Sequence, residues 1–119
     1  MQFLRVERAS SKISKEKNAY IFVFEFTNFS DEPKSTHSDF WIDFYQNNTQ
    51  IGYGLSDSYS DSNEKQSELL HSAYNKALKN GTIPFALFVV AKDSSPITVE
   101  IRRNGGSGDE STLFEVNLD

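Results

Sequence analysis

The chain has 119 residues, with 17 acidic against 12 basic residues, a net charge of -5 and no cysteine. This length predicts a single domain over residues 1–119, large enough to bury one hydrophobic core. The lack of cysteine excludes disulfides and thiolate metal sites, and the acidic, scattered charge argues against a nucleic-acid partner. No apolar run approaches the ~20 residues of a membrane-spanning helix, so we expect no transmembrane segment.

The N-terminal part of the chain predicts two strands. Residues 3–8 alternate in the manner of a short strand, and the polar stretch 9–18 predicts a loop. In the next segment, aromatic residues occupy every second position: Tyr20, Phe22, Phe24 and Phe26. Because alternate side chains of a strand share one face, these rings need a second sheet to cover them. The segment therefore predicts the central strand of a β-sandwich.

A hairpin is predicted after a polar turn. Asn28, Ser30 and Asp31 are residues that bond their own backbone in turns, and Pro33 excludes a central strand there. Residues 39–46 then alternate, and Asn47-Asn48 predicts a tight turn into a return strand over 49–55. In that return strand Gly52 and Gly54 suggest a bulge or a close backbone approach.

The stretch 64–79 is the helical candidate. Its apolar residues keep the spacing of one helical face, and Asn80-Gly81 would end the helix in a left-handed conformation. The alternative is an irregular crossover. Residues 56–63 lack apolar periodicity and predict an exposed loop.

Three further strands follow. Residues 83–91 are almost all apolar, as in a strand covered on both faces, and residues 97–102 and 113–118 alternate. Turns are expected at 92–96 and 104–108. The resulting fold class is all-β, mainly β: an antiparallel, immunoglobulin-like sandwich of about seven strands with one short helix or crossover near 64–79.

The sequence indicates no catalytic residues, no metal site and no cofactor. His37 and His71 lack a ligand spacing, and Asp39 and Asp43 would lie about 13 Å apart along a strand, too far for a glycosidase pair. The oxygen-rich run Asp57, Asp61, Asn63 and Glu64 lacks calcium-loop spacing and favours a solvated loop. We therefore expect that the protein is not an enzyme.

The best binding candidates are aromatic. Trp41 and Tyr45 share one face of a predicted strand, and Tyr53 lies on the next one. Aromatic residues with a polar group are favoured at interfaces, which predicts a binding platform. The alternative is that one or more of them fill the core.

Several motifs resemble an uncharacterised family of Gram-positive surface or lipoprotein domains. They are Phe22-Val-Phe-Glu-Phe-Thr-Asn-Phe-Ser-Asp-Glu32, Trp41-Ile-Asp-Phe-Tyr-Gln-Asn47, Gly81 before a strand and Asp93-Ser-Ser-Pro-Ile-Thr-Val-Glu-Ile101. The resemblance spans roughly residues 3–103. It implies a secreted or lipid-anchored domain with a telokin-like immunoglobulin fold, with no known enzymatic activity and no established site residues. The stretch 64–79 departs from the extended crossover of that family, and Asn80-Gly81 replaces its Pro-Gly.

The functional expectation is an extracellular, cell-surface binding or accessory module whose ligand is a protein or a cell-wall glycan. Met1 leads directly into a strand-like pattern, so we expect the export signal to be absent from this sequence. Two alternatives stay open: a structural spacer domain of a surface lipoprotein, and a small acidic inhibitor or immunity-type protein that binds a basic partner.

Overall fold

A computed structural model describes residues 1–10, 13–14, 16–36, 40–54, 64–103 and 111–118. The predicted loop at 56–63 with the calcium candidates Asp57, Asp61 and Asn63, the turn at 104–108, His37 and Asp39 lie outside the described residues, whereas the fourth candidate, Glu64, begins α2. The elements, in chain order, are β1 (Gln2–Arg8), β2 (Ala19–Thr27), β3 (Phe40–Gln46), β4 (Thr49–Ile51), β5 (Tyr53–Gly54), α2 (Glu64–Ser72), β6 (Thr82–Val90), β7 (Ile97–Arg103) and β8 (Ser111–Val116).

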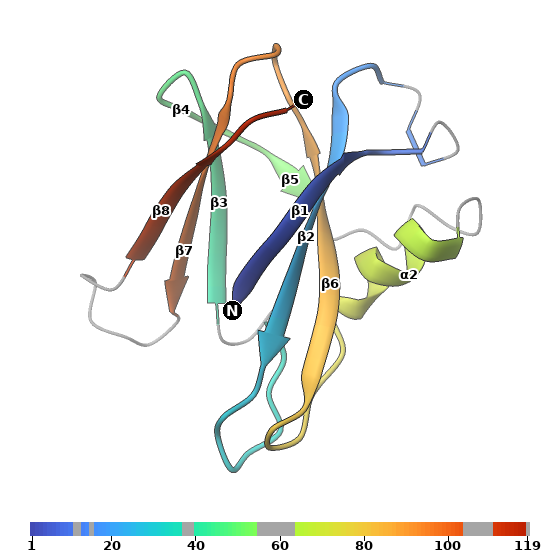
Figure 1. The fold of residues 1–119 in the computed structure, drawn as a ribbon, viewed down its shortest axis with the longest axis vertical. Helices are drawn as coiled ribbons and strands as arrows, with labels where there is room; N and C mark the ends of the chain where they lie inside the picture. The colour runs from blue at the N-terminus through green and yellow to red at the C-terminus, as the bar shows by residue number, and fades with distance from the viewer. Residues whose placement is uncertain (11–12, 15, 37–39, 55–63, 104–110, 119) are drawn as a thin grey trace.

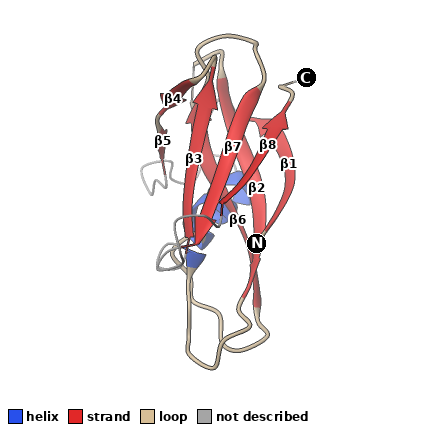
Figure 2. Cartoon of the chain, turned by 90° about the vertical axis from the view of Figure 1, so that its left-hand side faces the viewer, coloured by secondary structure: helices blue, strands red, loops and turns tan. Residues whose placement is uncertain are grey.

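The strands form two antiparallel sheets packed face to face (Figure 1). The first, here called the β2 sheet, has the order β1-β2-β6-β5, and the second, the β3 sheet, has the order β4-β3-β7-β8. Figure 2 shows the β3 sheet from its outer side. This order is that of an immunoglobulin-like sandwich with one strand added beside β3. The predicted all-β sandwich is confirmed.

The core between the sheets is built on the alternating rings of β2. Phe22, Phe24 and Phe26 are buried on the inner face, and Phe44 of β3 meets Phe22 edge to face with ring centroids 5.0 Å apart. Phe24 stacks on Phe85 of β6 at 5.3 Å. The predicted row of aromatic rings on β2 therefore lies at the centre of the sandwich.

The outer face of the β2 sheet is covered by the helix. Figure 1 shows α2 beside β6, on the side away from β3, β7 and β8. Leu70 packs there with Ile21 and Val23 of β2 and with Phe88 of β6. This second cluster explains why both faces of β2 and β6 are apolar along much of their length.

The helix is shorter than predicted. It ends at Ser72, and the chain continues through turns to Ala77, whose backbone pairs with Lys34 in an isolated bridge. Asn80, at φ 66°, lies in the turn that leads into β6 rather than at the end of the helix. The bridge draws residues 73–79 away from the helical path, so the predicted span 64–79 was wrong at its C-terminal end.

The predicted return strand is divided between the two sheets. The predicted tight turn at Asn47 and Asn48 is present, with positive φ at both residues, and β4 pairs with β3. At Gly52 the chain then crosses to the β2 sheet, where β5 pairs with β6. A Cβ added at Gly52 would meet no atom within 4 Å, so the close backbone approach suggested by the sequence is absent there.

Buried side-chain amides hold the loops to the sandwich. Gln46, at the end of β3, donates to the carbonyls of Asp93 and Ser95 and accepts from the Lys92 amide, with distances of 2.7 to 3.0 Å. Gln66 of α2 donates to the Glu7 carboxylate and the Arg8 carbonyl. Because each amide meets both donors and acceptors, these buried polar groups keep their hydrogen bonds.

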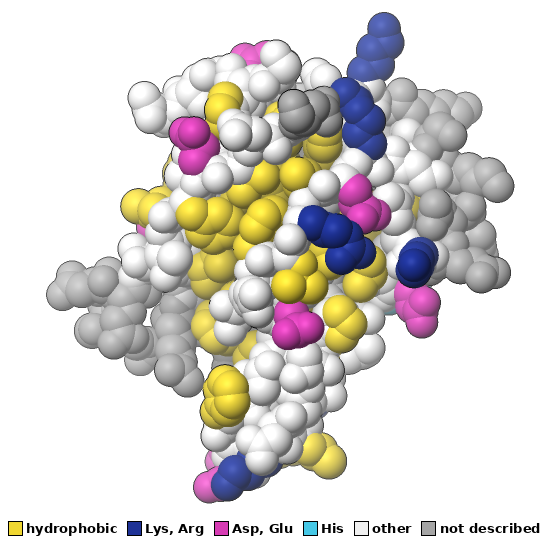
Figure 3. All heavy atoms as spheres, in the orientation of Figure 1, with side chains coloured by type: hydrophobic (Ala, Val, Ile, Leu, Met, Phe, Trp, Pro, Cys, Tyr) yellow, Lys and Arg dark blue, Asp and Glu magenta, His cyan; other side chains and the backbone are white. Residues whose placement is uncertain are grey.

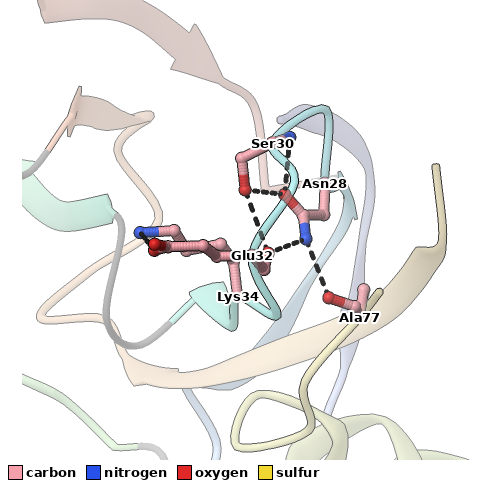
Figure 4. A network of polar contacts seen from close by, with 5 residues as sticks. All are labelled: Asn28, Ser30, Glu32, Lys34 and Ala77. Atoms are coloured by element: carbon pink, nitrogen blue, oxygen red, sulfur yellow. Dashed lines mark hydrogen bonds and ion pairs between the residues drawn. The ribbon is translucent and has the colours of Figure 1, made fainter. Parts of the chain in front are cut away.

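Asn28 connects two loops in the same way (Figure 4). Its side-chain oxygen accepts from the Ser30 amide at 2.9 Å and from the Ser30 hydroxyl at 2.8 Å. Its amide nitrogen donates to the carbonyls of Glu32 at 2.7 Å and Ala77 at 2.8 Å. One buried residue therefore joins the loop after β2 to the segment before β6.

Candidate functional site

The outer face of β3 carries two of the predicted binding residues. Trp41, Asp43 and Tyr45 alternate with the buried Ile42 and Phe44, so they point away from the core. The Trp41 side chain is 55% exposed. The strand pattern thus places an indole and a phenol on one open sheet surface.

The register of β7 supplies charged neighbours for these rings. Trp41 lies opposite Arg102, and Asp43 lies opposite Glu100. The Arg102 guanidinium lies 5.6 Å from the centre of the Trp41 ring, and Arg102 forms an ion pair with Asp43 at 2.9 Å. Such an exposed pair adds little stability by itself, but it fixes the guanidinium over one face of the indole.

Tyr45 is held by the same group of charges. Its hydroxyl donates to the Glu100 carboxylate at 3.0 Å. On the neighbouring strand, Gln50 donates to Asp43 at 3.3 Å. We call Trp41, Asp43, Tyr45, Glu100 and Arg102 the aromatic face. Its polar groups bond one another, so the rings are oriented before any ligand arrives.

A shallow depression of about 250 Å³ lies at one end of the aromatic face. Its walls are Tyr45, Asn48, Thr98, Glu100 and Leu113. The depression combines an aromatic ring and an aliphatic side chain with a carboxylate. Such a surface can bury part of a side chain or sugar of a ligand while it satisfies a donor group.

Tyr53 does not belong to the aromatic face. It lies on β5 opposite Val89, a core residue, and its ring meets Phe44 edge to face at 5.4 Å. It therefore points toward the interior at the rim of the sandwich, where it remains 41% exposed. Burial, followed by the charge of Asp43, raises its pKa. The structure places Trp41 and Tyr45 on one sheet surface but Tyr53 elsewhere, because the chain crosses to the other sheet at Gly52.

The charged members of the aromatic face were missed as site residues. Glu100 and Arg102 occupy outward positions of an alternating strand, which the sequence does predict. Their placement beside Trp41 and Tyr45 depends on the pairing of β3 with β7, and alternation alone does not specify that pairing. The strand order of an immunoglobulin-like sandwich is the signal that would have found them.

The ionisation of Tyr45 offers a test of the contact with Glu100. That hydrogen bond, together with burial and the charges of Glu100 and Asp43, raises the pKa of Tyr45 above its ordinary value of 10.0. Glu100→Gln removes the charged acceptor, so we expect the pKa of Tyr45 to fall toward that ordinary value. Ultraviolet difference titration against Tyr45→Phe isolates this phenol. Glu115→Gln, which removes a carboxylate opposite Thr98, is the matched control and should leave the titration unchanged.

Among the described residues, His, Cys, Asp and Glu side chains form no group of three that could hold a metal ion. His71, the histidine that the structure describes, lies exposed in α2. The described part of the chain also holds no helix with the length and apolarity to cross a membrane.

The fold and this surface define the protein as an immunoglobulin-like β-sandwich with an open aromatic sheet face. Comparison with protein families extends this result: residues 4–103 match the family described as Domain of unknown function (DUF5067). The chain belongs to that family, which confirms its resemblance to an uncharacterised domain family. Comparisons with curated proteins and with solved structures gave no match.

Proposed function

We propose that this protein is a non-enzymatic binding or accessory module at the surface of a Gram-positive bacterium, in a secreted protein or a lipoprotein. In this proposal the domain is of the telokin-like immunoglobulin type, and its ligand, a protein or a cell-wall glycan, docks on the aromatic face. The resemblance of the sequence motifs to surface domains supports the location. The outward position of Trp41 and Tyr45 supports the binding role.

The single observation that carries the proposal is the half-exposed indole of Trp41, held beside Arg102 on a rigid sheet. Trp, Tyr and Arg are the residues most enriched at the energetic centres of protein interfaces. A protein ligand is favoured over a glycan because Arg102 already lies over one face of the indole. A sugar that stacks on Trp41 would have only the other face.

The test is loss of binding without loss of folding. We expect Trp41→Ala to weaken capture of surface proteins, or of a cell-wall glycan on an array, by about 30-fold. Truncating a residue at the energetic centre of an interface to alanine costs about 2 kcal/mol or more of binding free energy. Tyr45→Ala should have a smaller effect in the same direction. Both variants should melt at the wild-type temperature, since neither side chain lies in the core.

Phe29→Ala is the matched control, because Phe29 is an aromatic residue that is 78% exposed in the loop after β2. If Trp41→Ala and Phe29→Ala bind equally well, the aromatic face is not the docking surface, and the spacer role becomes the better account. The sequence of the whole precursor tests the location separately. A lipid-attachment cysteine after an export signal would support a surface role.

The acidic character of the chain favours a second candidate, an inhibitor or immunity-type protein. The net charge is -5, and Asp43 and Glu100 lie on the aromatic face beside a single arginine. A basic partner would be drawn to such a surface, and its association rate would fall as salt is added. Binding to glycans or to neutral proteins would show no comparable salt dependence.

A further inference from the structure

We infer that β8 is a pairing edge through which two copies of this chain associate into one continuous antiparallel sheet. This inference does not rest on the proposed function. It comes from the length, regularity and charge of the edge strands, because an edge strand presents backbone N–H and C=O groups that another strand can bind. The chemistry of such an edge selects an extended peptide segment as its partner.

The other described edges are protected against pairing. β4 covers only Thr49–Ile51 and β5 only Tyr53–Gly54, so each offers a very short edge. β1 has an irregularity in its register between Phe3 and Arg5, and it carries charged side chains toward its end. Short strands, bulges and charges are the usual means by which proteins block edge pairing.

β8 lacks these protections. It pairs with β7 in unbroken register from Ser111 to Val116, and among the described residues no strand pairs with its other side. Its sequence contains no proline and no basic residue, and its charged residue is Glu115. On its outer face Leu113 is 61% exposed. A regular, nearly uncharged edge with an exposed leucine is a surface suited to strand addition.

An apolar strip lies next to this edge. Figure 3 shows hydrophobic side chains gathered in the middle of the molecular face that carries β1 and β8. Phe114 of β8 and Phe3 of β1 are only partly buried there, with ring centroids 5.4 Å apart. A strand added to β8 would place its inward side chains over this strip and remove it from water.

The sequence of β8 is complementary to itself in an antiparallel register centred on Leu113. Residues that face each other across two strands must point to the same side of the sheet, so the two-fold axis must lie midway between one residue and its own copy. With the axis at Leu113, this leucine meets its own copy on the outer face, and Phe114 meets Thr112 on the inner face. Glu115 then lies opposite Ser111, so that no like charges meet. An axis at Phe114 would instead place Leu113 against Glu115, and an axis at Glu115 would oppose two carboxylates.

The occupant that the edge fits is therefore a second copy of this chain, related by a two-fold axis at Leu113. Such an interface is isologous, as in most homodimers. It would join two β3 sheets edge to edge and place two aromatic faces on the same continuous surface. A ligand with repeated binding groups would then meet two sites at once.

Sedimentation velocity of the whole chain tests this inference. We expect a reversible dimer to form as the protein concentration is raised to about 1 mM, because this range includes weak association. Leu113→Lys should weaken the dimer by at least about tenfold, because two ammonium groups would meet at the axis. Leu78→Lys, which changes another exposed leucine before β6, is the control and should associate as the wild type does.

A charge-swap experiment fixes the register. Leu113→Lys and Leu113→Glu should each be largely monomeric alone, and an equal mixture of the two should recover the dimer, since opposite charges then face each other. Thermal melts of each variant verify folding. A wild-type chain that stays monomeric throughout the concentration range would overturn the inference. So would a dimer that Leu113→Lys leaves intact, or a mixture that fails to associate.

Discussion

We expect Phe22→Ala to lower the free energy of unfolding by about 3–5 kcal/mol, the usual cost of removing a buried phenylalanine ring. Phe22 is fully buried in β2, and its ring contacts Phe44 of the opposite sheet and Phe3 of β1. The substitution leaves a cavity at the place where both sheets meet. Since a domain of this size is stable by only about 5–15 kcal/mol, this loss is a large fraction of the total.

Urea denaturation of the variant and the wild type measures this effect. Phe29→Ala is the matched control, because it is the same substitution in the loop that follows β2, at a side chain that is 78% exposed. It should change stability by less than about 0.5 kcal/mol. A double-mutant cycle with Phe44→Ala should give a coupling of about 0.5–1.5 kcal/mol for the edge-to-face contact. Equal losses at Phe22 and Phe29 would contradict the two-sheet core.

The layers of the fold could be predicted because they depend on local alternation. In β2 the period of two separates rings that face the opposite sheet from residues that face the helix, and this separation survives in the structure. The position of each strand in its sheet could not be predicted in the same way. The return strand 49–55 reads as continuous, yet Ile51 and Tyr53 belong to different sheets. Alternation specifies which side of a sheet each side chain faces, but it does not specify which strand pairs with which.

The helix illustrates a similar limit at its end. Its first turns have a local cause, an apolar stripe that includes Leu70 and packs on β6. Its end has a distant cause, the backbone bridge between Ala77 and Lys34. A capping signal such as Asn80-Gly81 was therefore placed correctly as a turn but assigned to the wrong element.

The candidate site follows the same division. Trp41 and Tyr45 were predicted together because alternate residues of one strand point to the same side of a sheet. Tyr53 was grouped with them only because it is near in the sequence. The motifs behind the family resemblance have a structural role in this chain: they contain Asn28, Gln46 and Asp93, which hold turns through hydrogen bonds. Motifs that specify a scaffold therefore need not mark a ligand site.

The second large effect is expected at Asn28. We predict that Asn28→Ala lowers the free energy of unfolding by about 2–4 kcal/mol, because it removes four hydrogen bonds of one buried side chain at once, and each such bond contributes about 0.5–1.5 kcal/mol. The Ala77 carbonyl keeps the Lys34 N–H as a donor and the Glu32 carbonyl keeps the Ser30 hydroxyl, so the expected loss is that of the Asn28 bonds themselves. Asn117→Ala, in an exposed position after β8, is the control and should be nearly silent. Chemical denaturation measures both.

Asn28→Asp separates the local turn from the long-range connection. Aspartate makes the same turn with the Ser30 amide as asparagine does, so a purely local role predicts little change. The structure predicts the opposite. The substitution replaces the donating nitrogen with a second carboxylate oxygen, which would face the Glu32 and Ala77 carbonyls. At neutral pH this repulsion should make Asn28→Asp at least as unstable as Asn28→Ala. Wild-type stability in Asn28→Asp would show that the contact with Ala77 does not hold the two loops together.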